Sequence, residues 1–188
     1  MYSLASRHNV CMAHQFTTSY LDDSLALFRQ YKRQAESAID QVPDDRLDFA
    51  PDAESNSIAI IVKHMAGNMR SRWTDFLIAD GEKPDRARDT EFEVPPSTRA
   101  ELLAVWNDGW RSVFAALEPL SDADLTRTIT IRGEPHSVMQ AVNRQVAHYA
   151  AHIGQIVYLA KHFRAGEWKS LSIPRGKSAE YLSRVPKS

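Results

Sequence analysis

Apolar residues recur at three- and four-residue spacings in four stretches of the chain, a period typical of amphipathic helices that bury one face. The stretches cover residues 16–41, 58–79, 98–117 and 137–163. A β-branched, alternating segment at 126–131, followed by a turn at 132–134, predicts a short strand or hairpin. The pattern therefore predicts an all-α bundle with a small β element before the last long helix.

Residues that cap helices support three of these boundaries. Ser57 closes a Ser-Asn-Ser run that offers N-caps for the second stretch. Thr98 and Glu101 form a capping-box pattern before the third stretch, and Ser137 and Gln140 form another before the fourth. These pairs place the starts of the predicted helices within a residue or two.

Two segments lack a helical period. The charged run at 82–93 is followed by two prolines, and we interpret it as a solvated connection that crosses the end of the bundle. From residue 165 onward no clear period remains, which predicts an irregular tail lying across the bundle. Neither segment is expected to form a long helix.

Length and composition limit the classes of function. The 188 residues suffice for one domain, assigned to residues 16–188, and residues 1–15 are expected to form a disordered N-terminal extension. A net charge of −1 provides no overall positive field for nucleic acid, and no apolar run approaches the roughly 18 residues of a membrane span. The lone Cys11 excludes an intramolecular disulfide and fits a reducing cytoplasm, so a metal would be bound by His, Asp or Glu.

Candidate chemistry lies on the second and fourth predicted helices. His148 and His152 are four residues apart, which places both imidazoles on one face of a helix. His64 lies within an apolar stretch, where an imidazole without a partner loses its hydration for nothing in return. Each helix carries a polar stripe at intervals of four residues, formed by His64, Asn68 and Arg72 on one and by Arg144, His148 and His152 on the other.

Two interpretations of these histidines are open. In the first, His64 forms a hydrogen bond inside the core, and His148 and His152 are surface or interface residues; spacing alone gives this interpretation about even odds. In the second, the two stripes face each other and share a metal. Polar stripes between apolar helices are costly unless their groups satisfy one another, bind a metal or line a solvent cavity, and this favours the second interpretation.

Three segments resemble a known superfamily. They are the second-helix sequence from Val62 to Trp73, the fourth-helix sequence from Asn143 to Gln155 with its H-x-x-x-H pair, and the tail from Trp168 to Lys177. Together they resemble a bacterial branch of the DinB/YfiT-like superfamily of metalloenzymes, over nearly the whole chain from about residue 16. The resemblance implies a four-helix bundle, commonly a homodimer, that binds a divalent metal (zinc or nickel in relatives) through His64, His148 and His152.

The chemistry expected at such a site follows from its ligands. Three neutral imidazoles leave the ion its full charge and an open coordination position for water or a thiol, as in catalytic sites. Asn68, Gln145 and Gln155 are candidates to orient the rings. Arg72, Arg144, Trp168 and Arg175 are candidates to bind a substrate, although solvated charge or core packing is the alternative for each.

We expect a metal-dependent enzyme that acts on a small anionic or thiol-bearing molecule. Thiol transfer with a low-molecular-weight thiol is favoured by the resemblance alone, since characterised relatives include thiol-dependent transferases. A glutamate-assisted hydrolase is disfavoured because no carboxylate lies one turn from the ligands in sequence. The remaining alternatives are a metal-dependent hydrolase, a non-catalytic module that binds a metal or small ligand, and a stress-related dimer whose histidine cluster is structural.

Overall fold

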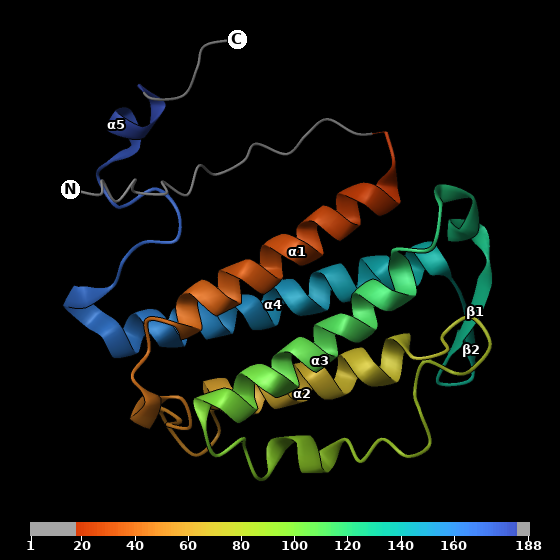
Figure 1. Ribbon diagram of the computed structural model, residues 1–188, viewed down its shortest axis with the longest axis horizontal. Coiled ribbons are helices and arrows are strands. Elements are labelled where there is room, and N and C mark those ends of the chain that lie inside the picture. Colours follow the sequence, from red (N-terminus) through yellow and green to blue (C-terminus); the bar gives the residue numbers. More distant parts are fainter. Residues whose placement is uncertain (1–17, 184–188) are drawn as a thin grey trace, which may run out of the picture.

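The computed structural model describes residues 18–183, and four long helices dominate it (Figure 1). The expected N-terminal extension, residues 1–15, lies outside the described residues. The helices are α1 (Tyr20–Ile39), α2 (Ile58–Trp73), α3 (Arg99–Leu117) and α4 (Val138–Arg164). The predicted helical bundle is confirmed, and within the described residues no helix has the length and apolar character needed to cross a membrane.

The four helices associate as two pairs. α2 packs mainly on α3 and α1 mainly on α4, whereas α2 and α4 meet along a thinner seam. The connection at 74–98 runs back along the bundle, so that α2 and α3 point the same way (Figure 1). At one α2–α3 contact a Cβ on Gly109 would lie 2.8 Å from Cα of Ala66, so glycine permits the close approach of these two helices.

The helix starts agree with the capping residues of the sequence. The side chains of Ser57, Thr98 and Ser137 each accept a hydrogen bond from the backbone N–H three residues later. Gln140 completes its capping box by accepting a bond from the N–H of Ser137. The carboxylate of Glu101 instead accepts from the N–H of Ser97, so the Thr98 box is only half formed.

A buried aromatic cluster forms the centre of the core. The rings of Phe28 on α1, Trp110 on α3 and Tyr149 on α4 lie 5.6–6.1 Å apart between centroids, in tilted or edge-on arrangements. Trp73, at the end of α2, donates a 3.1 Å hydrogen bond to the Tyr149 hydroxyl. This bond joins α2 to α4 about two and a half turns beyond His64.

The predicted β element is an antiparallel hairpin of β1 (Thr128–Ile131) and β2 (Glu134–Ser137). Its turn has positive φ at Arg132 and Gly133, as a two-residue hairpin turn requires. The Asp80 carboxylate accepts a 2.8 Å bond from the backbone N–H of each of these two residues, and Gly81 pairs with Thr130 through the backbone. The connection that follows α2 is thereby fixed to the hairpin.

Two elements differ from the prediction. α2 ends at Trp73 rather than near residue 79, because Thr74 is extended and Asp75 has φ +49°, which turns the chain and brings Phe76 under Trp73, 5.2 Å between ring centroids. The tail also contains a five-residue helix, α5 (Ser178–Leu182). Its residues are exposed, and it lies away from the four long helices (Figure 1).

Candidate metal centre

Three histidines from two helices converge on the seam between α2 and α4. His64 is buried on α2, and His148 and His152 are half-buried on α4. One ring nitrogen from each lies within 4.8 Å of the others, and the Nε2 atoms of His148 and His152 are 3.0 Å apart. Two nitrogens of a tetrahedral zinc site lie roughly 3.3 Å apart, as follows from Zn–N distances near 2.0–2.1 Å. The His148–His152 distance is close to this spacing, and a ring shift of at most about 1.5 Å would bring all three nitrogens to a shared divalent ion.

The opposite nitrogen of each ring contacts a side-chain oxygen. Nδ1 of His64 lies 2.9 Å from a Glu91 carboxylate oxygen. Nδ1 of His148 lies 3.3 Å from the Gln145 amide oxygen, and Nδ1 of His152 lies 2.8 Å from that of Gln155. Since a carboxylate or an amide oxygen only accepts, each Nδ1 carries the proton and each Nε2 presents its lone pair toward the common point.

Glu91 is the part of this arrangement that the sequence did not reveal. It lies in a short 3-10 helix, Asp89–Phe92, inside the run interpreted as a solvated connection, yet it is only 6% exposed. Arg86 grips both of its oxygens, with Nε 2.8 Å from Oε1 and Nη2 2.9 Å from Oε2. A Cβ on Gly67 would lie 2.3 Å from Oε1, so glycine at that position of α2 makes room for the carboxylate.

The surroundings of the cluster shift the pKa values of its titratable groups in directions that favour binding of a cation. Burial opposes ionisation of Glu91, but the bonds to His64 and Arg86 outweigh it and hold the pKa of this carboxyl below its usual range. Burial, with smaller contributions from His152 and His64, lowers the pKa of His148 to about 3. Burial also lowers the pKa of His152. At neutral pH both α4 rings are therefore uncharged, as metal ligands must be.

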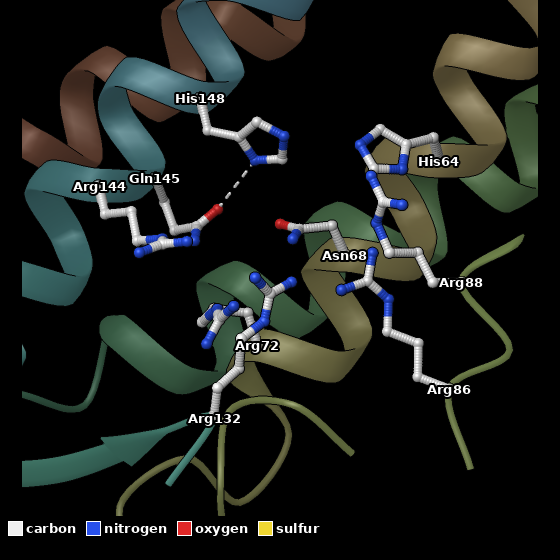
Figure 2. Close-up of a pocket in the computed structure, with 9 residues that line it drawn as sticks. All are labelled: His64, Asn68, Arg72, Arg86, Arg88, Arg132, Arg144, Gln145 and His148. Atoms are coloured by element: carbon white, nitrogen blue, oxygen red, sulfur yellow. Dashed lines mark hydrogen bonds between the residues drawn. The ribbon is translucent and has the colours of Figure 1, made fainter. Parts of the chain in front are cut away.

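A cavity of about 320 Å³ opens beside the histidines. Figure 2 shows guanidinium groups that point into it from α2, from α4, from the 74–98 connection and from the hairpin turn. The residues that line it are His64, Asn68, Arg72, Arg86, Arg88, Arg132, Arg144, Gln145 and His148. Two of the three histidines thus face a chamber large enough for a small molecule.

Two polar residues of α2 in this chamber are buried with polar atoms that have no partner. Arg72 is 2% exposed, and within the described part of the chain its Nε and Nη1 make no hydrogen bond. Its nearest ion-pair contact is long, 3.8 Å from Nη2 to Glu82. The side-chain oxygen of Asn68, 6% exposed, also lacks a partner among these residues, and Figure 2 shows it turned toward the centre of the cavity.

The residues expected from the sequence to orient the rings or bind a substrate do not all lie at the site. Gln145 and Gln155 contact histidine rings, whereas Asn68 lines the cavity and forms no hydrogen bond to a histidine ring among the described residues. Arg72 and Arg144 line the cavity. Trp168 and Arg175 are not among its lining residues, because the tail continues from the end of α4, three turns beyond His152.

Comparison with solved structures places this bundle among DinB-like proteins. YjoA of Bacillus subtilis, a DinB-like protein, superposes with a TM-score of 0.58 at 16% identity, covering 79% of this chain and 96% of that one. A DinB-like protein of Bacillus cereus ATCC 10987 gives 0.56 at 15% identity, covering 75% and 91%. At this identity the likeness concerns the fold, and the DinB-like bundle expected from the sequence is confirmed.

The family assignment is direct. The model of DUF1572, a family described as proteins of unknown function, matches residues 15–177, and the chain belongs to that family. A search of curated proteins returned no significant match. The assignment names no reaction, so a function has to be argued from the site.

Proposed function

We propose that this protein is a metal-dependent enzyme that acts on a small molecule at a divalent ion, zinc or nickel, held by His64, His148 and His152. One observation supports the proposal most directly: one nitrogen of each of the three rings lies within 4.8 Å of the others, while each Nδ1 meets a side-chain oxygen. Imidazoles that served only as packing would not need all three outer nitrogens fixed in this way. The adjoining cavity gives a substrate access to the cluster.

The side chains around the cluster support catalysis rather than a closed structural site. A divalent ion held by three neutral imidazoles supplies a Lewis acid with a coordination position open to substrate or thiol. Among the described residues the grouping of possible ligands comprises three histidines and no fourth side chain. Glu91 and Gln145 hold the rings in place, so their orientation is fixed before a substrate enters.

Thiol transfer is the reaction we favour over hydrolysis. A glutamate-assisted hydrolase needs a carboxylate free to accept a proton, but Glu91 has both oxygens bound by Arg86 and one also by His64. A thiol-bearing co-substrate would bring its own nucleophile, and the described residues place no cysteine in this site. The resemblance to thiol-dependent relatives points the same way. The homodimer also implied by that resemblance remains a prediction, which light scattering on the full chain would test.

Elemental analysis of untagged protein tests the metal site. We expect about one divalent ion per chain in the wild type and little in His148→Ala, because two imidazole ligands bind a divalent ion much more weakly than three. His162→Ala is the matched control, since His162 is an exposed histidine of the same helix outside the cluster. Equal metal content in the wild type and in both variants would refute the ligand assignment.

An assay for thiol conjugation tests the reaction. Metal-loaded and metal-stripped protein are incubated with a low-molecular-weight thiol and an electrophile, and loss of free thiol is followed with time. We expect turnover only in the loaded protein, and loss of turnover in His148→Ala but not in His162→Ala. Turnover that does not depend on the metal would exclude thiol transfer at this centre.

A further inference from the structure

The side chains that line the cavity beside the histidines are rich in positive charge. Five arginines line it and no carboxylate does. Within residues 18–183, only Glu82 and Glu91 form ion pairs with these arginines: Glu82 with Arg72, Arg86 and Arg132, and Glu91 with Arg86. Two ion-paired carboxylates among five guanidinium groups, with Asp80 near Arg72, leave the lining of the cavity with a net positive charge. A concave, partly enclosed surface focuses such a field onto whatever enters it.

Solvated surface charge explains some of these arginines but not all. Arg88 and Arg144 are exposed, and neither forms an ion pair with a described residue, which is common for surface arginines. Arg72 is different because it is 2% exposed and keeps two nitrogens without partners. Burying a guanidinium costs several kcal/mol unless it is paired and hydrogen-bonded. The cost indicates that the partner of Arg72 is a group that arrives from outside.

The backbone holds this side chain in place. Gly81 lies against the guanidinium, so that a Cβ there would be 2.6 Å from Nη1 of Arg72. Gly81 is itself fixed by its 2.8 Å backbone bond to Thr130 of the hairpin. Burial lowers the pKa of Arg72, the charge of Glu82 raises it, and the like charge of Arg144 lowers it further. An anion placed among these arginines would relieve both the desolvation and the repulsion.

We propose that the substrate of this site carries at least two negative charges, on a phosphate or on carboxylates, and that Arg72 and Arg144 bind its anionic end. The inference rests on the proposed function, because it assigns the ligand to the cavity that the histidines border. Guanidinium forks bind the oxygens of phosphate and carboxylate in pairs, which suits both groups. The shared chemistry is a compact oxygen dianion. The reacting end then faces His64 and His148, which border the same cavity.

Calorimetric titration of the full-length, metal-loaded protein with simple probes tests this inference. The probes are inorganic phosphate, succinate and the neutral diol 1,4-butanediol, which matches succinate in length. We expect phosphate or succinate to bind at one site, more weakly as salt is added, and the diol not to bind. The tighter of the two dianions identifies the head group. Failure of both dianions to bind at low salt would overturn the inference.

Matched variants locate the binding. Arg144→Gln should weaken dianion binding about tenfold or more, the usual loss for a hydrogen bond to a charged group. Arg111→Gln, on an exposed arginine of α3 outside the cavity, should leave it unchanged. Arg72→Met should abolish binding while the melting temperature holds or rises, because a buried cation is removed. Equal losses in Arg144→Gln and Arg111→Gln would mean that overall charge, and not this cavity, binds the anion.

Metal content measured on the same samples separates the two proposals. Full metal content without dianion binding would reject the anionic substrate and leave the metal centre standing. Dianion binding by wild-type protein that holds no divalent metal would support the anion site and reject the metal enzyme. Arg144→Gln should retain its metal, since Arg144 contacts none of the three histidine rings by hydrogen bond among the described residues.

Discussion

Replacing Gly67 by alanine tests whether Glu91 controls the metal centre. In the middle of a helix, alanine is favoured over glycine by about 1 kcal/mol. At Gly67 the new Cβ would lie 2.3 Å from Oε1 and 2.7 Å from Cδ of Glu91, which is impossible without movement. The carboxylate must therefore leave its place and give up its bonds to Arg86 and His64.

The size of the effect follows from what the displaced carboxylate leaves behind. The Arg86 side chain is 5% exposed and keeps its 3.1 Å ion pair with Glu82, so the loss of Glu91 costs up to about 3–5 kcal/mol, the cost of removing one partner of a buried ion pair. Set against the helix gain, the net loss in unfolding free energy is at most about 2–4 kcal/mol. For a chain of this length that lowers the melting temperature by roughly 4–16 °C. His64 also loses its orienting partner, which typically weakens metal binding by about 10–100-fold.

Urea unfolding of metal-free protein, followed by fluorescence of the buried tryptophans, measures the first effect, and titration against a chelator of known affinity measures the second. Gly154→Ala is the control, because Gly154 lies inside α4 and a Cβ there meets nothing within 4 Å. It should gain up to about 1 kcal/mol and bind metal normally. If Gly67→Ala proved as stable as Gly154→Ala and held metal as tightly, the role assigned to Glu91 would be wrong.

Four further predictions concern polar groups of the site and of the hairpin turn. Asn68→Leu removes an unsatisfied acceptor and should raise the unfolding free energy by about 1–3 kcal/mol without loss of metal. A lower unfolding free energy in urea titrations would contradict this prediction. Because the folded-state pKa of His148 is about 3, the unfolded chain takes up the proton first as pH falls below about 6.5, so the unfolding free energy should decrease from there toward pH 3. For the same reason metal should remain bound at pH 6 in a dialysis series, and complete release at that pH would refute the burial argument. Asp80→Ala frees two backbone N–H groups of the exposed hairpin turn and should lower the unfolding free energy, with faster hydrogen exchange at Arg132 and Gly133.

The sequence indicated those features that arise locally. Helix period and capping pairs gave the four long helices, and the four-residue spacing of His148 and His152 gave one side of the site. The end of α2 was misplaced because apolar residues continue past Trp73, while the turn depends on a positive φ at Asp75 that the residue type does not announce.

The contacts missed from the sequence join distant segments. Glu91 is 27 residues from His64, and an acidic residue inside a charged run is ordinarily solvated. The signal available was Gly67, a helix-weakening residue three positions after His64, whose reason is visible only once the carboxylate is seen beside it. Arg86, Arg88 and Arg132 likewise reach the cavity through a connection and a turn whose paths no period encodes.

The thin seam between the two helix pairs bears on how the molecule moves. One histidine belongs to the α2–α3 pair and two belong to the α1–α4 pair, so a cation shared by all three would link the two pairs, in addition to the buried aromatic cluster and the Trp73–Tyr149 hydrogen bond. Sliding of one pair by a fraction of a helical turn would spread the ring nitrogens and release the ion. The affinity for the cation therefore depends on the relative position of the two helix pairs. Mutations far from the histidines that shift this position will change the affinity.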